Sequence, residues 1–174
     1  MKTLHILRHA KAEEGRGKAD KERNLTDRGV RAATVLGLYL RQQNIKPDLI
    51  LCSPASRTKQ TMEHLLRSLD CSIETRFDEK LYHADPSQIA DAIAATESTF
   101  NNVLLIGHNP GLQLFVAEKS KDVEGEGDDI DRIYQGFPTA ALASLNFSIS
   151  DWTEILKRGC KGQLVAYVEP SDLV

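Results

Sequence analysis

Short apolar segments alternate with longer amphipathic segments over the first two thirds of the chain. The apolar segments have the length of buried strands, and the amphipathic segments repeat their apolar residues every three to four positions, as helices do. This alternation is typical of a parallel sheet that helices cover on both faces. The pattern predicts strands at 3–7, 49–52, 72–76 and 103–106, and helices at 26–43, 53–69, 85–97 and 112–117.

Signals at the helix starts support this order. Thr26 is a predicted N-cap, and Ser53-Pro54 and Asp85-Pro86 each combine an N-cap residue with proline at the first helical position. The last third differs, because strand-like segments follow one another with short turns. These segments are 140–147, 152–157 and 164–168. We therefore predict a three-layer α/β/α sandwich with a mainly parallel central sheet, to which the last strands add antiparallel or edge positions.

The composition limits the classes of protein to consider. With 174 residues, of which 41% are hydrophobic and 27% charged, the chain suits a single domain over 1–174 with a sizeable core. It has no apolar run of the roughly 20 residues that span a bilayer, and no signal-peptide pattern. Its 3 cysteines lack the spacing of a disulfide framework or a zinc site, which favours a cytoplasmic location. The net charge of −3 argues against a nucleic-acid partner, and a monomer is the default expectation.

The charge is unevenly distributed. The stretch from Glu118 to Asp131 holds seven acids and two lysines, so its local net charge is −5 and the rest of the chain carries +2. The segment 11–31 is locally basic. We expect the acidic stretch to be a solvated, disordered insertion.

Arginine and histidine side chains follow three of the predicted strands. Arg8-His9 ends the first strand, Arg57 lies in the first turn of the helix after the second strand, and His108 follows the strand at 103–106. Ligands of open α/β sheets bind at the carboxyl ends of the strands, so we expect these four residues to converge there. Nothing acidic follows the same strand ends to neutralise the arginines, which makes a phosphoryl group the natural ligand.

The two histidines suit phosphoryl transfer. A neutral imidazole is a good nucleophile toward phosphorus, and nearby arginines disfavour its protonation. One histidine can attack in line while the other, with the arginines, stabilises the phosphoryl oxygens. The chain has neither a Walker-type loop nor a carboxylate cluster for magnesium, so we expect no metal ion and no cofactor.

Five segments together resemble a known family. Leu7-Arg8-His9-Ala10 resembles the Arg-His-Gly signature of the histidine phosphatase superfamily, 53–61 resembles its S-P-x-x-R-x-x-x-T segment, and 107–110 resembles its second-histidine segment. The segments 24–29 and 137–141 are similar to those of the short SixA-type branch, the phosphohistidine phosphatases. The resemblance covers nearly the whole chain, and it implies the phosphoglycerate-mutase-like fold and a phosphatase activity.

The resemblance also implies roles for individual residues. His9 would be the nucleophile that becomes phosphohistidine, and Arg8, Arg57 and His108 would bind the phosphoryl group and stabilise the transition state. Asn109 either lines the pocket as a substrate-binding residue or only initiates the turn that follows.

Two departures from the family pattern matter. Ala10 stands where the family usually has glycine, which narrows the backbone freedom after the nucleophile, and we expect it to be tolerated. No residue securely matches the general acid of the larger members, for which Glu79 is the best candidate. Because a phosphoramidate needs less help from an acid than an alkyl phosphate does, the missing acid favours a phosphohistidine substrate.

We predict a metal-independent phosphatase that acts through phosphohistidine on His9. Its predicted substrate is a phosphorylated protein, such as a histidine phosphotransfer domain. Two alternatives stay open: a phosphatase of a small phosphorylated metabolite or nucleotide, and a non-catalytic module that binds phosphate or a phosphoprotein. Of the other histidines, His5 is expected in the core and His64 on a solvated helix face. For His83, contact with the substrate is one of two open interpretations.

Overall fold

The structure, a computed structural model, describes residues 1–121 and 127–173. Its strands are β1 (Lys2–Arg8), β2 (Leu49–Cys52), β3 (Glu74–Phe77), β4 (Asn102–Gly107), β5 (Leu142–Phe147) and β6 (Gln163–Val168). Within the described residues they form one six-stranded sheet in the order β3-β2-β4-β1-β5-β6. The strands β1 to β4 are parallel, whereas β5 is antiparallel to both of its neighbours. The predicted α/β fold with a mainly parallel sheet is therefore confirmed.

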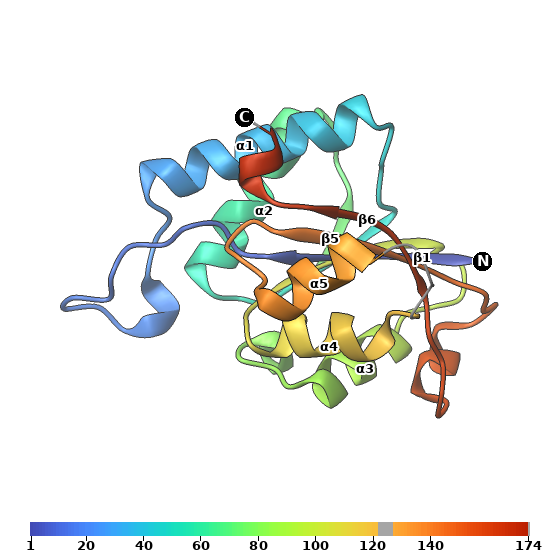
Figure 1. The fold of residues 1–174 in the computed structure, drawn as a ribbon. Coiled ribbons are helices and arrows are strands. Elements are labelled where there is room, and N and C mark those ends of the chain that lie inside the picture. Colours follow the sequence, from blue (N-terminus) through green and yellow to red (C-terminus); the bar gives the residue numbers. More distant parts are fainter. Residues whose placement is uncertain (122–126, 174) are drawn as a thin grey trace.

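Helices cover both faces of the sheet (Figure 1). They are α1 (Asp27–Gln42), α2 (Ser56–Leu69), α3 (Pro86–Ala94), α4 (Gly111–Lys119) and α5 (Gly127–Gln135). The pair α1 and α2 packs on one face, and on the other face α4 contacts both α3 and α5. Across the described ranges, no helix offers an apolar run long enough to cross a bilayer.

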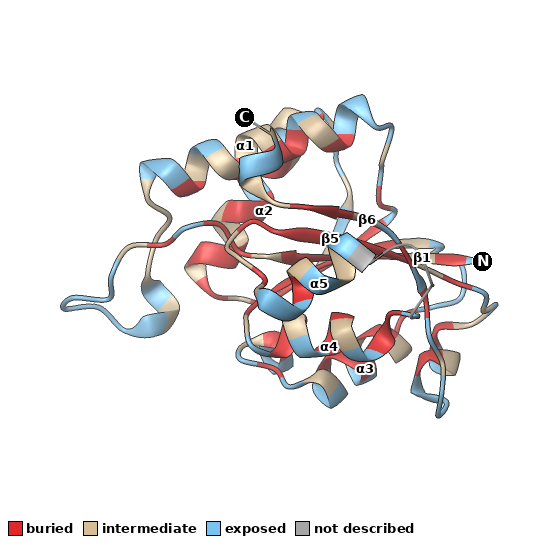
Figure 2. Cartoon of the chain, viewed as in Figure 1, coloured by how far each residue is buried: buried red, intermediate tan, exposed pale blue. Residues whose placement is uncertain are grey.

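The core lies on both faces of the sheet because side chains alternate along each strand. In β1, Leu4 and Ile6 join the cluster beneath α3 and α4, whereas Leu7 joins the cluster beneath α1 and α2. Figure 2 shows the central strands buried between the two helical layers. Strands that are buried on both faces present side chains to a ligand only at their ends, and the predicted site residues lie at the carboxyl ends.

Two predicted helix caps are confirmed. The Thr26 hydroxyl accepts a hydrogen bond from the backbone N–H of Gly29 at 3.1 Å, at the start of α1. Asp85 and Gln88 form a reciprocal capping box at the start of α3. These caps fix the ends of the two loops that lead into α1 and α3.

The start of α2 differs from the prediction. The helix begins at Ser56 with Ala55 as its N-cap, whereas the hydroxyl of Ser53 lies beside Nε2 of His108. A serine caps a helix only when its side chain is free to do so, and this one has another partner. The helix α3 also differs, since it ends at Ala94, before the predicted end.

The strand predicted at 152–157 is wrong, because this segment is a 3₁₀ helix, Trp152–Leu156. Asp151 caps it by accepting a hydrogen bond from the backbone N–H of Thr153 at 2.9 Å. The buried side chains of Trp152 and Ile155 lie three positions apart, which is the repeat of a 3₁₀ helix.

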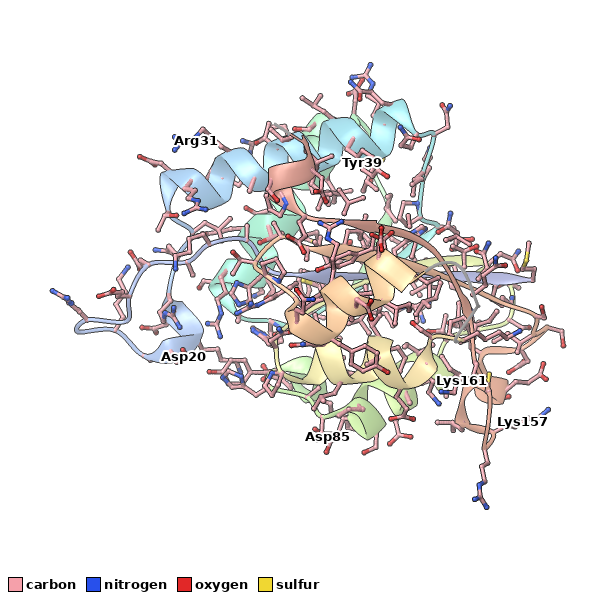
Figure 3. The ribbon with its side chains drawn as sticks, in the orientation of Figure 1. Asp20, Arg31, Tyr39, Asp85, Lys157 and Lys161 are labelled. Carbon is pink, nitrogen blue, oxygen red and sulfur yellow. The ribbon has the colours of Figure 1, made fainter. Side chains whose placement is uncertain are left out.

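The loop that follows β1 is anchored rather than free. Its two sides form a bridge at Ala12 and Leu25. Gly29 lets the first turn of α1 approach the loop closely, since a Cβ there would lie 2.1 Å from the carbonyl oxygen of Lys11. The loop therefore carries a short 3₁₀ helix, Asp20–Glu22, to a fixed place beyond the carboxyl end of β1 (Figure 3).

The prediction of a disordered insertion over 118–131 is wrong for the parts that the structure describes. The first residues of this stretch complete α4, and residues 127–131 belong to α5. Arg132 of α5 forms ion pairs with Asp129 at 3.3 Å and with Asp172 at 2.8 Å. Residues 122–126 of the same stretch lie outside the described residues.

Candidate active site

The four predicted residues meet at the carboxyl ends of the central strands. Because Arg8 of β1 pairs with Gly107 of β4, His9 and His108 leave adjacent parallel strands at the same level. Their ring centroids lie 5.3 Å apart. Both histidines, Arg8 and Arg57 line one cavity of about 230 Å³, and we call these four residues the floor. The other lining residues are Lys11, Ala12, Asp20, Arg23, His83, Asn109 and Thr139.

His9 has one ring nitrogen fixed and the other free to react. Nδ1 lies 2.8 Å from the carbonyl oxygen of Ala10, which can only accept, so Nδ1 carries the hydrogen and Nε2 carries the lone pair. Burial lowers the pKa of His9 to about 4, and Arg57 and Arg8 add to this against the opposing hydrogen bond to Ala10. His9 is therefore neutral at neutral pH, and burial is a larger cause than the arginines.

His108 is held by a residue that the sequence analysis assigned to a helix cap. The hydroxyl of Ser53 lies 2.8 Å from Nε2 of His108. Burial first, and then Arg57 and His9, lower the pKa of His108 to about 2, so this ring is also neutral. Ser53 directly follows β2, and its place at the same sheet edge was the signal that could have pointed to the site.

The two arginines keep donors available for an anion. Arg8 Nη1 and Asn109 Nδ2 both donate to the carbonyl oxygen of Phe137, each at 2.9 Å. The Nε atoms of Arg8 and Arg57 are buried and have no hydrogen-bond partner among the described residues. Buried donors without partners cost about 1–3 kcal/mol each, and a ligand with several oxygens would satisfy them. Asn109 also accepts from the backbone N–H of Gln113 at 3.3 Å, so it both lines the cavity and supports the turn.

Two hydroxyl groups explain the spacing of the segment around Arg57. Thr61 Oγ1 donates to the carbonyl oxygen of Arg57 at 2.6 Å and accepts from the backbone N–H of Ala10 at 2.9 Å. Thr58 Oγ1 donates to the carbonyl oxygen of Ser53 at 2.7 Å. The first turns of α2 are thereby tied to the nucleophile segment. Ala10 is not among the residues with positive φ, which explains why alanine serves there in place of glycine.

The segment 137–141 supports the nucleophile from the other side. The backbone N–H of Ala140 lies 3.1 Å from the carbonyl oxygens of both Arg8 and His9. Ala140 has a φ of 62°, a left-handed conformation that is unfavourable for alanine. This conformation separates the turn from β5, which begins at Leu142 rather than at the predicted residue 140.

Asp20 is the site residue that the sequence analysis missed. Its carboxylate accepts from Arg57 Nη2 at 3.1 Å and from Arg23 Nη1 at 2.9 Å, and its backbone oxygen accepts from Arg57 Nη1 at 2.7 Å. The expectation that no acid would neutralise the arginines is therefore wrong, because Asp20 reaches them from the loop. No sequence signal separates it from the other acids of that loop.

Asp20 also contacts two aromatic residues, Tyr82 and His83, and we call these three residues the rim. The hydroxyl of Tyr82 donates to Oδ2 of Asp20, and Nε2 of His83 lies 3.2 Å from the same oxygen. Hydrogen bonds from Tyr82 and Arg23 are the largest causes that hold the pKa of Asp20 well below its usual range, so it is ionised. The ring of His83 lies 5.2 Å from that of His108, which favours the interpretation that places it near the substrate.

Glu79, the candidate general acid, lies outside the cavity lining. Its carboxylate forms an ion pair with Lys21, and its side chain is 73% exposed. Its role as an acid stays a prediction. His5 is buried with Nδ1 2.7 Å from Ser144 Oγ, as expected of a core histidine, and His64 lies on α2 away from the cavity lining.

The set of floor residues defines the chemistry of the cavity. Two cations can bind phosphoryl oxygens, and a neutral imidazole with a free lone pair can attack phosphorus. Over the ranges 1–121 and 127–173, no cluster of three or more His, Cys, Asp and Glu side chains has the arrangement of a metal site.

Comparison with known proteins identifies relatives of this site. The family model described as the histidine phosphatase superfamily (branch 1) matches residues 4–116. An uncharacterized protein of Mycobacterium tuberculosis (strain ATCC 25618 / H37Rv) is 30% identical over 154 residues, which are 88% of this chain and 94% of that protein. An uncharacterized protein of Mycobacterium leprae (strain TN) is 33% identical over 144 residues, 80% of this chain and 86% of that protein.

Solved structures share the whole fold. A protein from Nakamurella multipartitia, provisionally identified as phosphohistidine phosphatase SixA, has a TM-score of 0.82 at 27% identity, over 97% of this chain and 96% of that one. Its counterpart from Agrobacterium tumefaciens has a TM-score of 0.79 at 27% identity, over 97% and 98%. The protein histidine phosphatase SixA in complex with tungstate shares the fold at 24% identity, with a TM-score of 0.78 over 99% of both chains.

Proposed function

The chain belongs to the histidine phosphatase superfamily and is a phosphatase, and we propose that it hydrolyses phosphohistidine on a protein through a phosphohistidine intermediate on its own His9. The observation that carries this proposal is the orientation of His9. Its Nδ1–H is fixed on the carbonyl oxygen of Ala10, so the lone pair of Nε2 is available in a cavity that Arg8 and Arg57 also line.

The reaction has two steps in this proposal. In the first, Nε2 of His9 attacks phosphorus in line while Arg8, Arg57 and His108 bind the phosphoryl oxygens. In the second, water attacks the phosphoryl group on His9 and releases phosphate. The two arginines stabilise the charge that develops on the oxygens, so a metal ion is not needed for this purpose.

The lack of a protonated carboxyl group in the part of the cavity that the structure describes supports a substrate whose leaving group departs easily. Asp20 is the one carboxylate that lines the cavity among the residues described, and its lowered pKa keeps it ionised at neutral pH. It therefore has no proton to give. A phosphoramidate such as phosphohistidine depends less on a strong acid than an alkyl phosphate does, because the imidazole that leaves is a weaker base than an alkoxide. The likeness to proteins identified as SixA supports the same substrate class.

The test is a side-by-side assay of the purified chain with four substrates. These are a phosphorylated histidine phosphotransfer domain, free phosphohistidine, phosphoserine and glucose 6-phosphate, each with and without a chelator. We expect kcat/KM to be highest on the phosphorylated domain, to be unchanged by the chelator, and to be accompanied by an acid-labile phosphoenzyme. Comparable rates on glucose 6-phosphate would favour a small phosphorylated metabolite instead, and chelator-sensitive turnover would contradict the metal-free mechanism.

A further inference from the structure

The backbone at His83 is held in an unfavourable conformation. Its φ is 53°, in the left-handed region that is uncommon for residues other than glycine. The neighbouring Ala84 packs against the start of α4 so closely that a Cβ on Gly111 would lie 1.8 Å from the Ala84 carbonyl oxygen. Such conformations persist where surrounding contacts over-determine them, and they concentrate at functional sites. The local packing therefore fixes the direction in which the imidazole leaves the chain.

That direction brings the ring of His83 into the cavity and onto a carboxylate. The ring centroid lies 4.2 Å from that of Tyr82 and 5.2 Å from that of His108. Its Nε2 lies 3.2 Å from Oδ2 of Asp20. An ionised carboxylate that accepts one ring N–H orients an imidazole, as in the His–Asp pairs of hydrolases. When both ring nitrogens carry a hydrogen, this arrangement leaves Nδ1–H as the proton that the ring can give.

Burial separates the rim from the floor. His9, Arg57 and His108 are 8%, 2% and 3% exposed, whereas the side chains of Asp20 and His83 are 43% and 54% exposed. In-line attack by His9 from the buried end drives the leaving group away from the nucleophile, toward solvent. The leaving group therefore departs past the rim, where His83 is.

We propose that His83 is a further catalytic residue, which donates a proton to the leaving group, and that Asp20 is the positioning residue that orients it. This inference rests on the proposed attack by His9. As the bond between His9 Nε2 and phosphorus forms, the bond from phosphorus to the leaving oxygen or nitrogen breaks, and the proton of the His83 imidazolium moves to the departing atom. In the second step, neutral His83 takes a proton from the attacking water, and phosphate is released from His9.

The charges around the rim are mixed. The cavity is also lined by the cations Arg8, Lys11, Arg23 and Arg57, so the pair of His83 and Asp20 lies among an excess of positive charge. The charged residues that line the cavity together with His83 are Arg8, Lys11, Asp20, Arg23 and Arg57, and Lys21 lies over the neighbouring ring of Tyr82.

If His83 donates this proton, its contribution to the rate should depend on the basicity of the leaving group. A proton donor accelerates the departure of a basic alkoxide or phenoxide by roughly 100- to 10,000-fold, and hardly affects a leaving group that is stable as an anion. His83 and Asp20 together would therefore allow the site to hydrolyse phosphate esters as well as phosphohistidine. The rate should depend more strongly on His83 as the leaving group of the ester becomes more basic.

The test compares His83→Asn with the native chain on dinitrophenyl phosphate and on phenyl phosphate. Asparagine tolerates the left-handed conformation, so this variant keeps the backbone and removes only the proton donor. We expect kcat/KM to fall at least about 30-fold on phenyl phosphate and less than about 3-fold on dinitrophenyl phosphate. His64→Asn is the matched control and should leave both rates within about 2-fold.

The Asp20→Asn variant tests whether Asp20 orients His83 or only supports the loop that follows β1. We expect the same preferential loss on phenyl phosphate, smaller than in His83→Asn, and no further loss when the two substitutions are combined. Equal losses of kcat/KM on both esters, or no loss on phenyl phosphate, would overturn the proposed roles of His83 and Asp20. Trapping of a phosphoenzyme in the native chain tests the proposed function separately, because its absence contradicts attack by His9 whatever the dependence on the leaving group.

Discussion

The floor and the rim of the cavity face the same small space but are built in different ways. Of the floor residues, His9, Arg57 and His108 are buried and Arg8 is half-buried, and all four follow from the ends of β1 and β4 and from the first turn of α2. The rim residues are more exposed and come from two loops that meet over the cavity. The position of the floor is dictated by strand order, whereas the position of the rim depends on how two irregular segments pack. The floor residues, which attack phosphorus and bind its oxygens and so need the most precise placement, thus lie on the more rigid part of the fold.

The largest expected effect comes from removing the nucleophile. His9→Ala should lower kcat/KM on an aryl phosphate by at least about 1,000-fold, because it removes the imidazole that attacks phosphorus in the proposed mechanism. Steady-state hydrolysis of p-nitrophenyl phosphate measures this loss. Residual activity above roughly 1% would mean that another nucleophile operates and that the floor is wrongly assigned.

Arg57→Ala tests the anion-binding part of the floor. We expect about a 100-fold loss of kcat/KM, because a buried guanidinium is removed from the place where charge develops in the transition state. Inhibition by inorganic phosphate should weaken as well. Arg57→Lys keeps the positive charge but lacks the planar guanidinium, so its kcat/KM should lie between those of the native chain and Arg57→Ala. An unchanged inhibition constant for phosphate would contradict the role of Arg57.

The floor histidines also make stability depend on pH. The pKa values of His9 and His108, about 4 and about 2, lie below the ordinary 6.5, so the unfolded chain binds protons that the folded chain does not. The free energy of unfolding should therefore fall as the pH drops below about 6.5, by at most about 1.4 kcal/mol per pH unit for each ring. Urea unfolding between pH 7 and pH 5 measures the slope.

His9→Asn should make this slope smaller, because unfolding of the variant takes up about one proton fewer than unfolding of the native chain. Identical slopes for the native chain and the variant would show that His9 is not held neutral by burial. The difference between the two slopes reports on His9, because His5 and His108, whose pKa values burial also lowers, titrate in both proteins, and Asp20 titrates at a more acidic pH.

The smallest expected effect is at Glu79, next to the rim. Glu79→Gln should change kcat/KM by less than about 2-fold on phenyl phosphate, because the carboxylate is exposed and ion-paired with Lys21 outside the cavity lining. Glu74→Gln, at another exposed ion pair, is the control. A loss of more than about 10-fold would make Glu79 the general acid and remove the need for His83.

The parts of the site that could be predicted from sequence are those fixed by periodicity and topology. The apolar strand at 103–106 and the strand before Arg8 had to be buried, and parallel neighbours had to end at one edge, so His9 and His108 converge. Asp20 could not be predicted, since its role depends on the path of a loop that Gly29 anchors by a close backbone contact. No local pattern encodes that contact.

The errors in secondary structure have a similar cause. Ser53 has the sequence of a helix cap, yet His108, far along the chain, occupies its hydroxyl. Trp152 and Ile155 fit a short apolar strand or a 3₁₀ helix equally well, and the capping box from Asp151 decides between them. In the first case a contact from far along the chain overrides the local preference, whereas in the second a local cap outweighs the strand-like composition.

The central place of β1 in the sheet has a consequence for folding. Its two neighbours are β4 and β5, so Leu4 pairs with Val103 on one side and with Leu145 on the other. Of the six described strands, β1 comes first in the chain, and its second edge is covered by β5, which comes fifth. An N-terminal fragment that stops before β5 leaves one edge of β1 without a partner, and the closure of such long loops slows folding. During synthesis, the catalytic floor can form only after most of the chain has left the ribosome.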